Sequence, residues 1–159
     1  QNRYGVTLQD DEILSLAGSQ EGFAHVALTL CDPGDVVLVP NPGYPVFEAG
    51  PFLNDAKIAY YELDKTNHYA PALDKIPEEL AKKAKMMVVS YPLNPTCTCI
   101  EKADYGKIIA FAKKYNIAII HDNAYSEIEY DGKRDFHSFP CRELKRSALN
   151  LIRCQRPII

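Results

Sequence analysis

Short apolar runs alternate with segments of helical periodicity along most of the chain, and both patterns are bounded by turn residues. The apolar runs predict strands over 12–17, 35–40, 57–63, 85–92 and 117–122. The helical spacing predicts helices over 18–30, 77–84 and 104–115. Strands that alternate with helices predict a fold of the α/β class, with three α/β/α layers around a mostly parallel sheet.

The alternation also indicates where a site should be sought. In open parallel sheets, ligands bind at the carboxyl ends of the strands, so the residues directly after each strand are the candidates. The lysines at the end of the predicted helix 77–84 suit the helix dipole and indicate a solvated face.

Composition places the chain among ordinary globular proteins. Its 159 residues are 47% hydrophobic and 25% charged, enough for one domain with a core. The net charge of −3, without a basic stripe, argues against a nucleic-acid partner. We expect no membrane span, because no apolar run approaches about 20 residues. The polar, acidic N-terminal stretch does not resemble a signal peptide.

The cysteines indicate neither a disulfide scaffold nor a metal site. Their number is odd, and they are Cys31, Cys97, Cys99, Cys141 and Cys154. The C-x-C pair is closer than the usual C-x₂-C zinc spacing, and no second ligand pair comes after it. We interpret them as reduced thiols of a cytoplasmic protein.

Two of the candidate segments are turns rich in small residues or proline. "AGSQEG" (17–22) leads directly into a helix, which suits a phosphate. Ser19 either adds a hydroxyl to such a site or simply caps the helix. In "PNPGYP" (40–45), two prolines and a glycine precede Tyr44, which either stacks on a flat ring or packs in the core.

Two further strand ends carry an amide and a carboxylate. Asn94 precedes a proline and either hydrogen-bonds a ligand or only forms a turn. Asp122 ends an apolar strand, where an unpaired carboxylate is costly, so it either caps the next segment or meets a cation. We interpret its neighbour His121 as structural. A planar, phosphorylated, nitrogen-heterocyclic cofactor would use all four groups together: the 17–22 turn for its phosphate, the ring of Tyr44, the Asn94 amide and the Asp122 carboxylate.

With these stretches in view, the chain resembles the large-domain core of class I/II aminotransferases, the fold-type I enzymes that depend on pyridoxal phosphate. The stretches that carry the resemblance are "RYGV", "GSQEGFAH", "DPGDVVLVPNPGYPVF", "YPLNPT" and "IIHDNAYSEIEYDG". The nearest branch includes the bacterial LL-diaminopimelate aminotransferases. The resemblance implies that Gly18, Ser19 and Gln20 meet the cofactor phosphate and that Tyr44 stacks on the pyridine ring.

The same resemblance implies roles for three more side chains. Asn94 and Tyr125 would contact the phenolic oxygen of the cofactor, and Asp122 would pair with its protonated ring nitrogen. That pairing keeps the ring positive, so that it serves as an electron sink. The family usually reads Y-P-N-N-P-T-G, whereas this chain has Leu93 and Cys97 in place of the first Asn and the Gly. A cysteine in place of that glycine is expected to strain the turn that carries Asn94.

The resemblance also implies a lysine that forms a Schiff base with the cofactor, within an S-x-S-K stretch. No such stretch is present; the last lysine, Lys145, lies in "CRELKRSA". We therefore expect residues 1–140 to be a partial cofactor-binding large domain, with no catalytic lysine and no turnover of its own.

The residues 141–159 do not resemble the family in their own reading frame. With permitted codon choices, the bases read from the third position of the Pro140 codon encode L-P-G-A-K-E-V-G-A-E-F-N-S-L-S-K-T-Y-N-M. That string resembles the family's continuation, S-L-S-K included. We expect 141–159 to be a frameshifted tail, which resequencing of the gene would test.

Three functions remain open at this stage. The first is an aminotransferase that moves an amino group between an amino acid and a 2-oxo acid, from a parent protein that is a homodimer. The second is a carbon–sulfur lyase of the same fold, since the cofactor supplies the chemistry in both. The third is a non-catalytic sensor or regulatory domain of aminotransferase-like fold.

Overall fold

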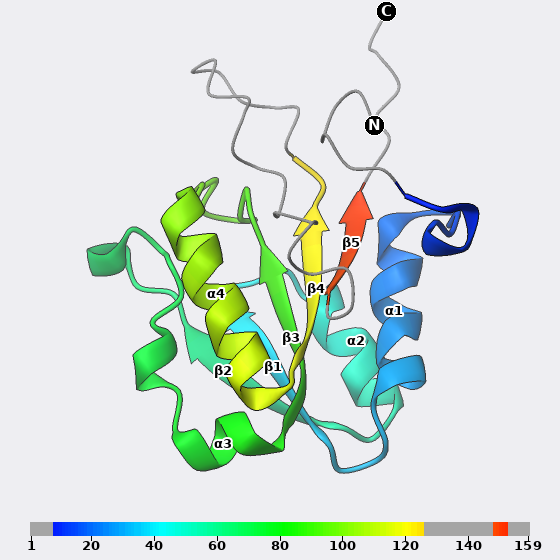
Figure 1. Ribbon diagram of the computed structural model, residues 1–159, viewed down its shortest axis with the longest axis horizontal. Coiled ribbons are helices and arrows are strands. Elements are labelled where there is room, and N and C mark those ends of the chain that lie inside the picture. Colours follow the sequence, from blue (N-terminus) through cyan, green and yellow to red (C-terminus); the bar gives the residue numbers. More distant parts are fainter. Residues whose placement is uncertain (1–7, 126–147, 153–159) are drawn as a thin grey trace, which may run out of the picture.

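A five-stranded parallel sheet forms the centre of the molecule (Figure 1). The computed structural model describes residues 8–125 and the backbone of 148–152. The strand order across the sheet is β2-β1-β3-β4-β5. The strands are β1 (Val36–Asn41), β2 (Lys57–Glu62), β3 (Ala84–Ser90), β4 (Ala118–Asn123) and β5 (Ala148–Ile152).

Helices cover both faces of this sheet, which confirms the predicted three layers (Figure 1). The helices are α1 (Ser19–Leu30), α2 (Val46–Leu53), α3 (Glu78–Lys83) and α4 (Lys102–Tyr115). Single 3₁₀ turns are formed by η1 (Asp10–Glu12), η2 (Lys65–Asn67) and η3 (Leu73–Lys75). Helices α1 and α2 pack on one face, and α4 packs on the other.

Each central strand is apolar on both sides because both faces are covered. In β1, Val36 and Leu38 belong to the core beneath α4, whereas Val37 and Val39 belong to the core beneath α1 and α2. Successive side chains of a strand point to opposite faces, so a continuous apolar run fits a strand that is buried on both sides. The run at 85–92, predicted as a buried strand, is confirmed as β3.

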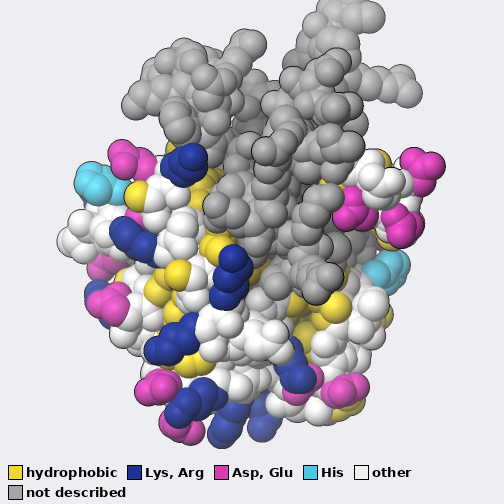
Figure 2. Space-filling model, in the orientation of Figure 1, with side chains coloured by type: hydrophobic (Ala, Val, Ile, Leu, Met, Phe, Trp, Pro, Cys, Tyr) yellow, Lys and Arg dark blue, Asp and Glu magenta, His cyan; other side chains and the backbone are white. Residues whose placement is uncertain are grey.

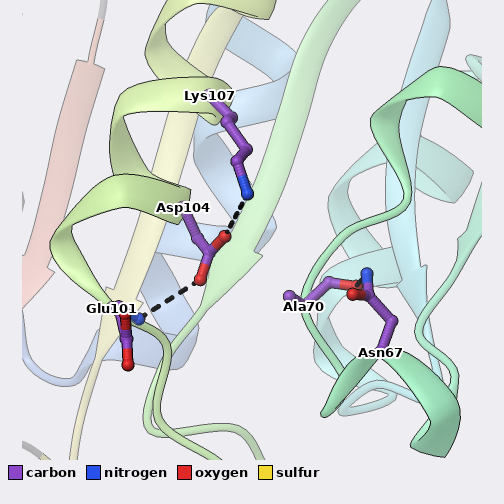
Figure 3. A network of polar contacts seen from close by, with 5 residues as sticks. All are labelled: Asn67, Ala70, Glu101, Asp104 and Lys107. Atoms are coloured by element: carbon purple, nitrogen blue, oxygen red, sulfur yellow. Dashed lines mark hydrogen bonds and ion pairs between the residues drawn. The ribbon is translucent and has the colours of Figure 1, made fainter.

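Helix α4 shows how the predicted amphipathic pattern becomes a stable element. Its apolar side chains, Ile108 among them, are buried under the sheet. At its start, the Glu101 backbone N–H donates to the Asp104 carboxylate at 3.4 Å (Figure 3). Lys107 Nζ donates to the other oxygen of Asp104 at 2.8 Å. At its end, Asn116 adopts the left-handed conformation that commonly ends a helix.

The predicted strand over 12–17 is wrong. Residues Asp10–Glu12 form a 3₁₀ turn, and 13–17 form neither helix nor strand. The side chains of Ile13 and Leu14 are 59% and 83% exposed. The Ala17 N–H donates to the Glu21 carboxylate at 2.8 Å instead of joining a sheet ladder. An apolar run becomes a strand only where another strand pairs with it, and none of the described strands lies beside this segment.

One α-helix and one strand were not predicted, and both depend on contacts between distant parts of the chain. Helix α2 contains Gly50 and Pro51, which argue against a helix by propensity. A Cβ atom on Gly50 would lie 2.5 Å from the Phe23 carbonyl oxygen, so the glycine permits close packing of α2 on α1. The other unpredicted element, β5, pairs in parallel with β4 and extends the sheet within the 141–159 segment.

Charges of both signs are mixed over the surface. Figure 2 shows Lys and Arg side chains beside Asp and Glu side chains over the part of this face that lies away from the carboxyl ends of the strands. Among the helices that the structure describes, none has the length and apolar character needed to cross a membrane.

Candidate functional site

Four of the predicted site residues lie at or after the carboxyl ends of three adjacent strands: Tyr44, Asn94, Asp122 and Tyr125. Gly18, Ser19 and Gln20 lie instead at the start of α1, which follows no described strand. Strands β1, β3 and β4 are neighbours, and their carboxyl ends lie at one edge. Ser90, at the end of β3, stands opposite Asp122 of β4 in the parallel register. The sheet therefore places the Tyr44 turn, the Asn94 turn and the Asp122 carboxylate along the same edge.

Helix α1 presents its N-terminus without a side-chain cap. Gly18 is the N-cap residue, and Ser19 is the first residue of the helix, so the alternative in which Ser19 caps the helix is wrong. The first N–H groups of a helix have no partner within it, and they attract anions. A Cβ atom on Gly18 would meet nothing within 4 Å, so this turn is open to a ligand. The Glu21 carboxylate accepts the N–H of Ala17 on the other side of the turn.

Tyr44 is half-buried and held by its neighbours. Its ring packs edge-on against Phe47, with centroids 6.0 Å apart and planes at 79°. Phe47 is buried and in turn contacts Phe23 of α1 at 4.9 Å. The preceding turn is tight, because a Cβ atom on Gly43 would lie 2.4 Å from the Pro40 carbonyl oxygen. Tyr44 therefore packs against the core, as one of the two sequence alternatives had it, and the stacking of its ring on a ligand stays a prediction.

A hydrogen bond joins two of the predicted site residues directly. Gln20 Nε2 donates to the Tyr44 hydroxyl oxygen at 2.9 Å. The two residues are 24 positions apart in sequence and come from the start of α1 and the turn after β1. The α1 N-terminus and the aromatic ring are therefore parts of one arrangement at this edge.

Asp122 is the most perturbed acid of the described site. It is 8% exposed, and burial raises its pKa to about 6, although the Ala124 backbone N–H and the Ser90 hydroxyl oppose that rise. Within the described part of the chain, neither Asp122 Oδ1 nor Ser90 Oγ completes a hydrogen bond of normal geometry. A buried carboxylate with an unsatisfied oxygen is costly, so it is well suited to a cationic ligand atom.

The turn after β3 carries Asn94 on a short closed loop. The Leu93 N–H donates to the Thr98 carbonyl oxygen at 2.9 Å, and the Cys97 N–H donates to the Leu93 carbonyl oxygen at 2.6 Å. Asn94 itself is half-buried. Cys97 has a φ of +57°, a left-handed conformation that favours glycine. The strain expected from a cysteine at this position therefore has a structural basis.

Two further residues named from the sequence, His121 and Tyr125, lie in or just after β4. Tyr125 is half-buried, two residues beyond the end of β4. His121 is fully buried, and its ring packs edge-on against Tyr105 of α4 at 5.7 Å, which fits a structural role. Across 8–125, no cluster of three or more potential metal ligands is present. Lys145 lies outside the described residues.

Sequence reasoning missed Ser90 as part of the site. Its hydroxyl lies beside the Asp122 carboxylate and is almost fully buried. A polar residue at the end of the apolar run "KMMVVS" was a signal for it. The family assignments of Gly18, Ser19, Gln20, Tyr44, Asn94, Asp122 and Tyr125 stay predictions as regards cofactor contact.

Comparison with known proteins gives a consistent set of relatives. The LL-diaminopimelate aminotransferase of Moorella thermoacetica is 42% identical over 135 residues, which are 84% of this chain and 35% of the relative. That of Desulforudis audaxviator is 45% identical over 133 residues, or 83% of this chain and 34% of the relative. The chain therefore spans about a third of the length of the curated relatives it matches.

Solved structures agree with these relatives. Substrate-bound BacF from Bacillus subtilis superposes with a TM-score of 0.88 at 36% identity, covering 95% of this chain and 38% of BacF. A probable N-succinyldiaminopimelate aminotransferase from Thermus thermophilus superposes with a TM-score of 0.85 at 29% identity, covering 95% of this chain and 40% of its own. The family model for aminotransferase class I and II matches residues 1–155. The chain belongs to the class I and II aminotransferase family.

Proposed function

We propose that this chain is the cofactor-binding core of a pyridoxal-phosphate-dependent aminotransferase. The family to which it belongs generally depends on pyridoxal phosphate. The single observation that carries the proposal is the buried Asp122 carboxylate at the carboxyl end of β4, with its raised pKa and an Oδ1 that has no hydrogen-bond partner of normal geometry among the described residues. Such a group is stabilised by a protonated ring nitrogen, because an opposite charge in contact favours the ionised form.

The residues at this edge fit the other parts of that cofactor. Gly18, Ser19 and Gln20 would hold its phosphate through the open N-terminus of α1. Tyr44 would support its ring, with the phenol oriented by Gln20 and Phe47. These contacts use backbone N–H groups, an aromatic face and polar side chains, which together fix the orientation of a flat ligand.

The chemistry divides between the cofactor and this chain. When bound, pyridoxal phosphate supplies an electron sink for the α-carbon of an amino acid. Asp122 would hold a proton at the ring nitrogen, and burial strengthens that interaction because little water screens it. Asn94 and Tyr125 would contact the phenolic oxygen and set its basicity. The reaction class proposed is transfer of an amino group between an amino acid and a 2-oxo acid in a homodimeric parent protein.

The curated relatives are LL-diaminopimelate aminotransferases, whereas one of the solved neighbours is a probable N-succinyldiaminopimelate aminotransferase and another an alanine aminotransferase from Pyrococcus furiosus. These names share the transfer of an amino group and differ in the amino acid.

Equilibrium binding of pyridoxal phosphate to the full chain tests the proposal, with tyrosine fluorescence or calorimetry as readout. Asp122→Asn keeps the shape of the side chain and removes its charge, so we expect binding at least about tenfold weaker, roughly 1.4 kcal/mol. Asp74→Asn, an exposed acid of η3, is the matched control and should leave affinity unchanged. Equal affinity of the wild type and Asp122→Asn would remove the observation on which the proposal rests.

Two further measurements separate the parts of the site. Pyridoxal, which lacks the phosphate, should bind more weakly than pyridoxal phosphate because it cannot use the N-terminus of α1. Borohydride reduction followed by peptide mapping should leave no cofactor on a lysine of this chain. A lysine adduct would contradict the expectation that the Schiff-base lysine is absent from it.

A further inference from the structure

The loop after β3 carries two cysteines that the proposed cofactor site does not use. Cys97 and Cys99 are both exposed, whereas Thr98 between them is half-buried. The side chains therefore alternate in direction along this stretch. Thr96 Oγ1 donates to Thr98 Oγ1 at 2.9 Å on the less exposed side, so side chains two positions apart meet there. Both cysteine residues, in contrast, are exposed.

The spacing of the two thiols is compatible with a disulfide. Two residues separated by one other have Cα atoms at most about 7 Å apart, and disulfides span Cα distances of about 4.4 to 6.8 Å. The Cys97 thiol makes a long contact of 3.9 Å with the Pro95 carbonyl oxygen, which is a weak restraint on its rotation. Rotation about χ1 does not move the Cβ atoms, which lie about 3.5–4.5 Å apart in a disulfide, so closure of the ring also requires the backbone of the loop to adjust.

We propose that Cys97 and Cys99 form a reversible disulfide, which makes the Asn94 turn a redox-modification site. The oxidant is a low-molecular-weight disulfide of the glutathione type. One cysteine thiolate attacks the disulfide, forms a mixed disulfide and releases one small thiol. The second cysteine thiolate then attacks the first cysteine sulfur and releases the second small thiol. Overall, two cysteine thiols are oxidised, one small disulfide is reduced to two thiols, and the protein retains no adduct.

A disulfide between these two cysteines would act on the turn that carries Asn94. Thr98, enclosed by the new ring, accepts the Leu93 N–H, and Cys97 donates to the Leu93 carbonyl oxygen. Both hydrogen bonds close the turn that presents Asn94. The ring therefore links the oxidation state of the thiols to the backbone that holds a site residue. This link holds whichever ligand binds at that site.

Peptide mapping of the oxidised chain tests the proposal directly. Trypsin cleaves after Lys85 and Lys102, so the peptide 86–102 contains both cysteines of the pair and none of the others. The full chain with Cys141→Ser and Cys154→Ser is incubated with oxidised glutathione and then quenched with an alkylating reagent. We expect peptide 86–102 to become lighter by two hydrogen atoms, with no glutathione attached, and dithiothreitol to reverse the change completely.

Single substitutions show whether the two thiols act together. In Cys97→Ser and Cys99→Ser, the remaining thiol has no partner in the peptide, so glutathione should stay attached to it. Cys31 provides an internal reference, because burial, and next the nearby Asp35 carboxylate, raises the pKa of its thiol. Its modification should be at least about tenfold slower than that of the pair. Stable glutathione adducts on both Cys97 and Cys99 of the parent chain, or oxidation only after denaturation, would overturn the proposal.

Discussion

The buried carboxylate of Asp122 leads to a prediction about stability as well as binding. Burial raises its pKa from 3.8 to about 6 in the folded chain. Between these two values the folded state holds a proton that the unfolded state has lost. Because the unfolded state then binds fewer protons, the free energy of unfolding falls as the pH rises through this window. The stabilisation is fully present below the unfolded pKa and is lost above the folded one.

The magnitude follows from the size of the shift. A difference of about two pKa units corresponds to roughly 3 kcal/mol between the acidic and neutral ends of the window. Asp122→Asn removes the titration and keeps a side chain that accepts the Ala124 N–H. The variant should therefore gain stability over the wild type by roughly 3 kcal/mol as the pH rises from about 4 to about 7.

Urea unfolding, followed by circular dichroism from about pH 4 to about pH 8, measures this difference. Other titrating groups cancel, since both chains share them. Asp64 provides a control of opposite sign, because hydrogen bonds from Thr66 lower the pKa of its exposed carboxyl. Asp64→Asn should lose stability relative to the wild type only as the pH rises toward the unfolded pKa of 3.8, so this control is measured below about pH 4, and above that pH the difference should stay constant. If the difference in the free energy of unfolding between the wild type and Asp122→Asn is constant from about pH 4 to about pH 8, the reasoning is refuted.

Five further substitutions, two of them matched controls, test the packing and the backbone geometry by urea unfolding. Gly50→Ala places a Cβ atom 2.5 Å from a backbone oxygen of α1 and should lower the free energy of unfolding by about 1–3 kcal/mol. Its control, Gly106→Ala in α4, meets nothing within 4 Å and should raise the free energy of unfolding by up to about 1 kcal/mol. Tyr61→Phe removes a buried 2.6 Å hydrogen bond to a carbonyl of β3 and should cost about 1–2 kcal/mol, with Tyr60→Phe, at a 51% exposed position, close to neutral. Cys97→Gly should stabilise by about 1 kcal/mol by relieving a left-handed φ, and equal or lower stability would contradict that source of strain.

The sheet and most of its helices were predictable because their signals are local. The run "KMMVVS" is apolar at its four central positions, which fits a strand that is buried on both faces. Helix α4 repeats its apolar residues at the helical period and begins and ends with suitable residues. The alternation of these elements was sufficient for the α/β class and for the edge at which the site lies.

The errors occurred where a structure depends on a distant partner. The apolar run at 12–17 had the composition of a strand but has no strand beside it, so its side chains remain exposed. Helix α2 forms against its own propensity, because Gly50 permits close contact with α1. Local composition carries no information about which segment will lie alongside, since that choice is made by packing across the whole chain.

The chemical groups of the candidate site could be identified from residue types alone: a phosphate-type turn at the start of a helix, an aromatic residue, an amide and a carboxylate. How these groups are perturbed and joined depends on the packing of the folded chain. Burial at the end of β4 raises the pKa of Asp122, whereas the neighbouring Ser90 hydroxyl opposes that rise. Packing of α1 beside the turn after β1 brings Gln20 within 2.9 Å of Tyr44. Residue types are local, whereas burial and hydrogen-bond partners arise only when distant segments pack together.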